Sequence, residues 1–173
     1  MHSPFAYRFV TDVLRPGPYI FYSYHEIDKF LEGKEHHDPR FIREIRFIIR
    51  LANFLKSKRI VAFSPKYRGA LIAARAMKKK FVRTPHGGNF VFSEGDLLII
   101  DNACHDSGLF SLVEEAIGKD VPVYMINPST EEREFLEQPR PTGLLLDDRN
   151  KIIMIPRSQM AYLAYHMNLE IRS

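Results

Sequence analysis

The chain has 173 residues, of which 45% are hydrophobic and 27% charged, and its formal net charge is +4. This length suits one globular domain, and the composition excludes intrinsic disorder, collagen and coiled coil. No apolar run approaches the roughly 18 residues of a membrane span, and the amino-terminal segment lacks the layout of a signal peptide. Since there is only one cysteine, which suits a reducing compartment, we expect a cytoplasmic protein without membrane association.

The basic charge is concentrated in one part of the chain. Residues 60–84 contain seven Lys and Arg but no Asp or Glu. A mildly basic chain with a pI near 9.2 commonly uses its charge for solubility. We therefore expect no nucleic-acid partner.

Two short helices are predicted at the amino terminus. Apolar residues from Phe5 to Leu14 recur at helical spacing, and the pattern ends at Pro16. Ser23 and Glu26 have the spacing of a capping box, which predicts a second helix before Gly33. We expect a polar loop over residues 33–37.

The strongest predicted helix runs from Asp38 to about Leu55. Asp38 is suited to the N-cap and Pro39 to the first helical position. An apolar face recurs along the segment, while a second face carries a row of arginines, Arg43, Arg46 and Arg50. Such a row is usually a solvated face, and we expect these arginines to be in solvent.

From residue 59 onward short β-rich runs alternate with helical segments, which is typical of a parallel sheet covered on both faces. The expected strands are 60–63, 80–83, 89–93, 96–101 and 121–126, and the expected helices are 68–78, 109–118 and 131–137. An antiparallel hairpin over 143–148 and 152–156 and a short helix over 158–165 are predicted to close the chain. We expect a single domain over 1–173, with a helical extension over 1–58 and a three-layer, Rossmann-like α/β core over 59–173.

Ligands of an open α/β sheet bind beyond the carboxyl ends of its strands, near the point where the strand order reverses. Three segments follow predicted strands in this way: SPKYRG at 64–69, TPHGG at 84–88 and DNACHDSG at 101–108. These loops are the candidate positions for a binding site.

Several segments, in the same order along the chain, resemble class I S-adenosylmethionine-dependent methyltransferases, in particular a bacterial group whose chains begin His-Ser-Pro-Phe. They are HSPFAYRFVTDVL, RFIIRLANFLKSKRIVAF, DLLIIDNACH and LLLDDRNKIIMIPRSQMAYLAYHMNLEI. The resemblance implies a methyltransferase-type sheet, mostly parallel with an antiparallel hairpin at its end.

The sequence departs from this family where the cofactor is held. The resemblance implies an acid at the end of the first strand and a glycine-rich turn, but Ala62 and Ser64 stand there and only Gly69 remains of the glycines. A second acid is implied after the second strand to bind the ribose hydroxyls, and Arg83 stands there. No room remains for a helix between the second strand and residue 89.

The loop after residues 96–101 keeps some polar residues. In the related group this position carries Asp-Gly-Asn-His, and Asp101, Asn102 and, one residue displaced, either Cys104 or His105 echo that run. His105 and Asp106 could serve as a general base or as metal ligands. Alternatively, Asp101 ends the strand and an Asx turn caps the next helix.

The same region is also similar to type I phosphoribosyltransferases. In that interpretation the 101–108 segment is the ribose-phosphate loop, and Lys66 and Arg68 contact a pyrophosphate near a helix N-terminus. Asn102 stands where the second acid is needed, and the loop is one residue too long.

These observations predict a methyltransferase-like protein with an eroded S-adenosylmethionine site, which acts without catalysis by binding a small anionic ligand or a protein partner. We expect no bound cofactor and no metal; S-adenosylmethionine would bind only if the site were functional. The alternatives are a phosphoribosyltransferase-like enzyme and a weakly active methyltransferase. The candidate ligand-binding residues are Ser64, Lys66, Arg68, Gly69, Asp101, Asn102 and His105.

Overall fold

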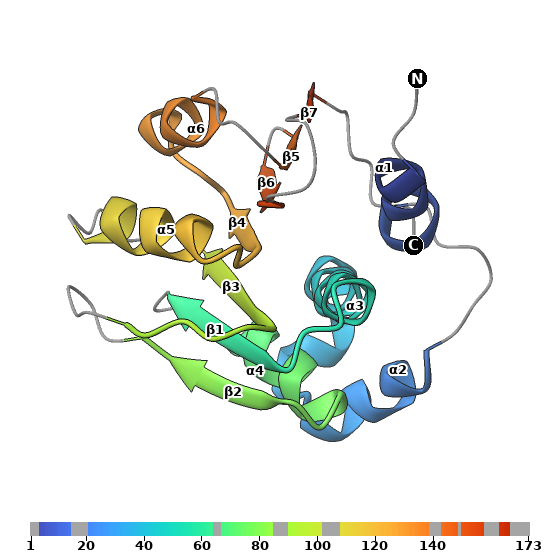
Figure 1. Cartoon of the computed structure of the whole chain (residues 1–173). Coiled ribbons are helices and arrows are strands. Elements are labelled where there is room, and N and C mark those ends of the chain that lie inside the picture. The colour runs from blue at the N-terminus through green and yellow to red at the C-terminus, as the bar shows by residue number, and fades with distance from the viewer. Residues whose placement is uncertain are drawn as a thin grey trace.

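A computed structural model of the chain describes residues 4–14, 21–63, 67–84, 90–101, 108–138, 143–148, 150–157 and the backbone of 163–166. These residues form a seven-stranded sheet with the order β2-β1-β3-β4-β6-β5-β7 (Figure 1). Its strands are β1 (Arg59–Phe63), β2 (Lys80–Arg83), β3 (Asp96–Asp101), β4 (Val123–Ile126), β5 (Leu144–Asp148), β6 (Lys151–Ile155) and β7 (Leu163–His166).

The sheet is mixed and mostly parallel. β1 pairs in parallel with β2 and β3, β3 with β4, and β5 with β7. Within the described sheet, only β6 runs antiparallel to its neighbours, β4 and β5. The expected α/β class with a closing antiparallel hairpin is confirmed, because β5 and β6 are consecutive and directly paired.

Helices lie on both sides of the sheet. They are α1 (Pro4–Phe9), the π-helical turn η1 (Val10–Leu14), α2 (Tyr22–Ile27), the 3-10 turns η2 (Asp28–Phe30) and η3 (Gly33–His37), α3 (Pro39–Phe54), α4 (Arg68–Ala76), α5 (Leu109–Gly118) and α6 (Thr130–Glu137). None of these helices is long and apolar enough to cross a bilayer.

Two hydrophobic cores follow from the alternation of side chains along each strand. On β3, Leu97 and Ile99 face the core that α1 to α4 cover, whereas Leu98 and Ile100 face the core that α5 and α6 cover. Residues that precede β1 thus supply most of one helical layer, with α3 at its centre.

The α3 helix begins as the sequence predicts. The Asp38 carboxylate accepts hydrogen bonds from the backbone N–H groups of Arg40 and Phe41, at 2.9 and 3.2 Å, and Pro39 occupies the first turn. This cap satisfies two of the four amides that a helix start leaves free. The predicted helices at 68–78, 109–118 and 131–137 are also present, with ends shifted by at most two residues.

The prediction for the start of α2 is wrong. Its N-cap is Phe21, which makes no side-chain cap hydrogen bond, so Ser23 lies inside the helix. The Glu26 carboxylate instead accepts from Lys29 Nζ at 2.7 and 2.8 Å. The predicted loop over 33–37 is the 3-10 turn η3, which a capping box of Glu32 and Glu35 begins.

The arginine row of α3 is not entirely in solvent, contrary to the prediction. Arg46 is exposed, but Arg50 is only 5% exposed. Its Nε donates to the Val13 carbonyl at 2.9 Å and its Nη1 to the Tyr24 hydroxyl at 3.1 Å. The helices that precede α3 fold back over this end of its polar face, and they provide acceptors for the buried guanidinium.

Two further predictions near the sheet are wrong. The described part of the predicted 89–93 strand, residues 90–93, is irregular, and Phe92 is buried in the core that α5 covers. The segment packs the side chains of Phe90 and Phe92 on the sheet and does not pair as a further strand. The predicted helix over 158–165 overlaps β7, since the open edge of β5 offers backbone partners from Leu144 onward; residues 158–162 lie outside the described part.

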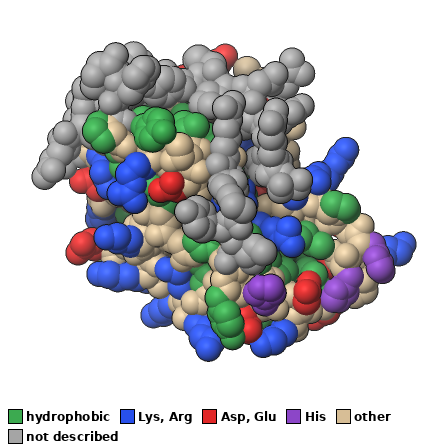
Figure 2. Space-filling view, turned by 90° about the vertical axis from the view of Figure 1, so that its right-hand side faces the viewer, with side chains coloured by type: hydrophobic (Ala, Val, Ile, Leu, Met, Phe, Trp, Pro, Cys, Tyr) green, Lys and Arg blue, Asp and Glu red, His purple; other side chains and the backbone are tan. Residues whose placement is uncertain are grey.

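The described surface carries many cations. On the face drawn in Figure 2, Lys and Arg side chains (blue) gather along the lower left, whereas the histidines (purple) lie to the right. This uneven distribution accompanies the positive net charge of the chain.

Candidate functional site

The candidate site lies where the carboxyl ends of β1, β3 and β4 meet. β1 lies between β2 and β3, so the strand order reverses beside it, and ligands of such sheets bind at this point. The described residues enclose a cavity of about 80 Å³ there. It is lined by Phe41, Glu44 and Ile48 of α3, Ala62 of β1, Tyr67, Gly69 and Ala70 at the start of α4, Ile99 and Asp101 of β3, and Ile126 of β4.

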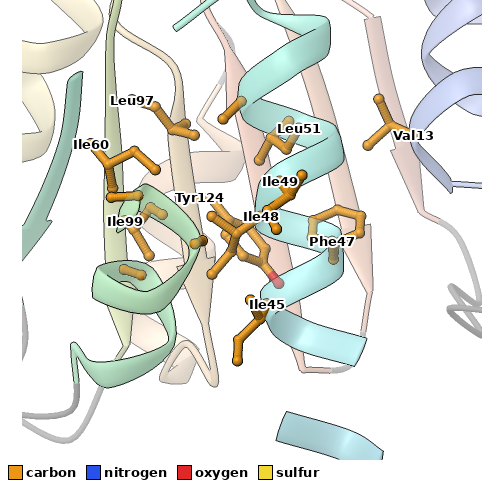
Figure 3. Close-up of a cluster of buried hydrophobic side chains, with 14 of the residues drawn as sticks. Val13, Ile45, Phe47, Ile48, Ile49, Leu51, Ile60, Leu97, Ile99 and Tyr124 are labelled. Atoms are coloured by element: carbon orange, nitrogen blue, oxygen red, sulfur yellow. The ribbon is translucent and has the colours of Figure 1, made fainter. Parts of the chain in front are cut away.

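The α3 helix fills most of the space above this part of the sheet. Phe41, Glu44 and Ile48 follow one another at the i, i+3, i+7 spacing that places them on one helix face. Neighbouring Ile45, Ile49 and Leu51 are fully buried in the core that α3 shares with the sheet and the other amino-terminal helices, and Figure 3 shows them along α3. The cavity that the described residues enclose is far below the roughly 300 Å³ at which small-molecule pockets begin.

A buried polar cluster lies beside the cavity. The Tyr124 hydroxyl of β4 donates to Glu44 Oε1, and the Lys151 ammonium of β6 donates to Glu44 Oε2. Tyr124 is fully buried, and the side chains of Glu44 and Lys151 are 17% and 16% exposed. Figure 3 shows Tyr124 reaching from the sheet toward α3 beside Ile48.

The Lys151 ammonium also lies over two aromatic rings, 5.5 Å from the centroid of Phe47 and 6.0 Å from that of Tyr124. Such cation–π contacts partly replace lost hydration. The three elements α3, β4 and β6 are thus joined by one carboxylate, Glu44, and its two donors. We call Glu44, Tyr124 and Lys151 the Glu44 cluster.

The environment of Tyr124 keeps its hydroxyl protonated. Burial raises the pKa of Tyr124 well above its usual value, and the negative charge of Glu44, the hydrogen bond to Glu44 and the more distant charges of Asp101 and Asp148 raise it further. A phenol with a raised pKa donates a hydrogen bond at neutral pH and does not accept a proton. The Glu44 cluster is therefore suited to holding α3 on the sheet.

The end of β2 is covered by a stack of side chains. The Arg83 guanidinium lies over the Tyr67 ring, 5.0 Å from its centroid. The Tyr67 ring in turn packs on Phe81, with 5.8 Å between centroids. A cation and an aromatic ring thus occupy the position where the family resemblance implies a carboxylate for ribose.

The structure directs Arg68 away from the cavity. Its guanidinium forms ion pairs with Glu32 at 3.0 Å and Glu35 at 3.3 Å, and it donates to the Phe30 carbonyl at 3.2 Å. The hydrogen bond that Arg68 donates to Glu32 is the largest cause that raises the pKa of Arg68 above its usual value. An anion at Arg68 would have to compete with two carboxylates.

Gly69 and Asp101 are brought together, since both line the cavity. Gly69 also packs closely on α3: a Cβ at this position would lie 3.5 Å from Phe41 and 3.8 Å from Ile45. The other candidate residues, Ser64, Lys66, Asn102 and His105, lie outside the described part of the chain.

Sequence reasoning missed all three members of the Glu44 cluster. The only available signal was Glu44 itself, a charged residue between Phe41 and Ile48 on the apolar face of a predicted helix. The partners Tyr124 and Lys151 are 80 and 107 residues away. Among the described residues, no group of three or more His, Cys, Asp or Glu is placed to hold a metal ion.

Comparison with known proteins adds no family to this description, because no protein-family model matches the chain, and no curated protein sequence matches it.

Proposed function

We propose that the chain is a methyltransferase-like protein that has lost its S-adenosylmethionine site and acts by binding instead of catalysis. The proposal rests on the family resemblance of the sequence and on the mixed α/β sheet, in which one antiparallel strand, β6, is inserted between β4 and β5. The size of the cavity at the strand ends carries the non-catalytic part of the proposal.

The cavity is too small for the cofactor. A nucleoside cofactor with an amino-acid tail needs a pocket of at least about 300 Å³, whereas the described residues enclose about 80 Å³. Phe41 and Glu44 bound the cavity on the α3 side, and the Glu44 cluster holds this helix to β4 and β6.

The charges around the cavity support the same proposal. Ala62 lines it at the end of β1, where an acid would contact the cofactor, and Arg83 covers the end of β2. Losing a bidentate hydrogen-bonding partner typically costs about 1 to 3 kcal/mol, so the loss of two carboxylates and the space between them removes most of the affinity.

The described part of the connection between β2 and β3 lacks a helix that would form one wall of a cofactor pocket. It spans residues 84–95, and its described residues, Thr84 and 90–95, contain no helix. Phe92 packs on the β1 face instead, in a core shared with Val61 and Phe63. A helix at this point would give a cofactor pocket its second side.

Titration calorimetry with S-adenosylmethionine and with S-adenosylhomocysteine tests the proposal. We expect no heat of binding for either compound up to about 1 mM, which corresponds to less than about 4 kcal/mol of affinity. A dissociation constant in the micromolar range for either compound would overturn the proposal.

An Arg83→Asp variant tests whether the small cavity or the lack of a carboxylate at the end of β2 prevents cofactor binding. Arg83 is exposed, so the substitution restores a carboxylate at the end of β2 with little risk to folding. We expect this variant to remain unable to bind, because the cavity volume is unchanged. If Arg83→Asp binds the cofactor, the cavity volume does not prevent binding, and the lack of a carboxylate at the end of β2 explains it instead.

A further inference from the structure

The amino ends of β1 and β2 carry a group of cations that the linear sequence separates. They are Lys56, Lys58, Arg75, Lys78 and Lys80, all exposed, and we call them the amino-end cluster. β1 and β2 pair in parallel with Arg59 opposite Lys80, so the two preceding turns lie about 5 Å apart, the spacing of neighbouring strands. The Lys79 ammonium donates to the Ser57 carbonyl and ties the two turns together.

Both turns have the same rigid geometry. After α3, Ser57 N–H donates to Ala52 O at 2.8 Å, and after α4, Lys79 N–H donates to Ala74 O at 2.9 Å. These are the hydrogen bonds of a Schellman motif, in which a left-handed residue ends the helix. Lys56 and Lys78 hold those left-handed positions, with φ of +54° and +55°. The cluster is therefore presented by ordered backbone.

Few acids neutralise the cluster. Glu94 and Asp120 line the same broad surface depression as Lys56 and Lys58. Glu26 lies near Lys78, but its carboxylate already accepts two hydrogen bonds from Lys29. No ion pair joins a member of the cluster to an acid within the part of the chain that the structure describes.

The two turns offer charge without a largely exposed apolar side chain: the apolar residues that line the neighbouring depression, such as Phe5 and Leu55, are half-buried. The large hydrophobic side chains that are exposed among the described residues are Tyr7, Tyr22 and Val91, and none belongs to the two turns. A peptide partner is usually held by buried aromatic or aliphatic anchors, and a membrane-bound surface helix by an apolar face. A phosphodiester backbone, in contrast, is bound by cations alone, without sequence preference.

We propose that the amino-end cluster binds the phosphodiester backbone of a nucleic acid. This site is separate from the cavity at the carboxyl ends of the strands, and it does not depend on the loss of the cofactor site. It revises the expectation of no nucleic-acid partner, because that expectation used the charge of the whole chain and not its placement in the fold.

Fluorescence anisotropy tests the proposal with two labelled probes, a DNA duplex of about 20 base pairs and a single-stranded RNA of about 20 nucleotides. Four or five phosphate contacts on duplex DNA predict a slope of about −4 for log affinity against log salt. The affinity should then fall by about 250-fold between 50 and 200 mM salt. The two probes show which nucleic acid supplies the backbone.

The test variant is Lys56→Asn with Lys78→Asn. Asn accepts the left-handed conformation of both positions, so the fold is kept while two charges are lost. We expect at least a tenfold loss of affinity at 50 mM salt and a salt slope that is smaller by about 2 on the duplex. The control is Lys34→Gln with Arg40→Gln, which removes the same charge from exposed residues near the other end of α3, and its affinity should stay within about twofold of the wild type.

Three outcomes would overturn the proposal. The first is that the wild type binds neither probe at 50 mM salt at protein concentrations up to about 100 µM, the weak end of nonspecific affinity. The second is that the control variant loses as much affinity as the test variant, which would assign binding to net charge alone. The third is that vesicles containing anionic lipid bind the protein while both nucleic-acid probes do not, which would assign the cluster to a membrane surface.

Discussion

The Glu44 cluster gives the sharpest test of how α3 is held on the sheet. A Glu44→Ala substitution removes the acceptor of the fully buried Tyr124 hydroxyl and of the Lys151 ammonium. Breaking a buried ion pair from one side costs about 3 to 5 kcal/mol. Because about one sixth of the Glu44 and Lys151 side chains is exposed, solvent reduces this value, and we expect a loss near the lower end, about 3 kcal/mol.

A double variant, Glu44→Leu with Lys151→Met, removes both charges at once. Replacing a buried ion pair with apolar residues of similar volume is often neutral, although here the Tyr124 hydroxyl also loses its acceptor. We therefore expect the double variant to lie within about 2 kcal/mol of the wild type and to be more stable than Glu44→Ala. Glu115→Gln is the matched control, since Glu115 pairs with Lys119 on the surface at 3.3 Å and such a pair contributes less than about 0.5 kcal/mol.

Urea unfolding followed by circular dichroism measures these differences at neutral pH, and thermal unfolding provides a second readout. For a chain of this length a loss of about 3 kcal/mol lowers the midpoint temperature by roughly 6 to 12 °C. The reasoning is refuted if Glu44→Ala is no less stable than Glu115→Gln. It is also refuted if the double variant is less stable than Glu44→Ala, because lost packing would then explain the effect better than an unpaired charge.

Other predictions concern protonation and close packing. The raised pKa of Tyr124 means that the unfolded chain releases this proton first, near pH 10. Its contribution to stability is therefore fully present below pH 10 and is lost as the pH rises further, and Tyr124→Phe should weaken that alkaline loss in urea titrations repeated from pH 8 to 11. Gly69→Ala should stabilise the protein by about 0.5 kcal/mol, since the new methyl group meets only ordinary contacts; a loss of stability in thermal unfolding would contradict this packing. Gly143→Ala should destabilise it by about 2 kcal/mol, because φ is +124° and the Cβ would lie 2.9 Å from the Ile155 carbonyl oxygen, and an unchanged midpoint would contradict that conformation. Arg50→Met should lower the free energy of unfolding by about 1 to 3 kcal/mol, because the Val13 carbonyl and the Tyr24 hydroxyl lose the guanidinium that donates to them; an unchanged urea midpoint would contradict that network.

Local sequence rules determined much of the helical and strand framework. Asp38 and Pro39 define the start of α3 because a cap and a fixed φ act within one turn. The continuous apolar run at 96–101 defines β3 because a strand that is buried on both faces needs no alternation. These signals depend only on neighbouring residues, so they can be read without the fold.

The tertiary structure decided what depends on residues that are far apart in the chain. Arg50 is buried because Val13 and Tyr24 fold back over α3. Residues 163–166 form a strand because the edge of β5 lies open to them. In both cases the free energy comes from a partner that local propensity does not encode.

The same distinction applies to the two sites. The sequence predicted a binding position at the loops that follow the strands, and it placed Ala62 and Arg83 where the family resemblance implies acids. Only the fold placed Glu44 beside Tyr124 and Lys151, and only the pairing of β1 with β2 gathered the amino-end cluster. Electrostatic interactions fall off with distance in space and not with separation along the chain, so the charges that define each site become visible when the sheet is assembled.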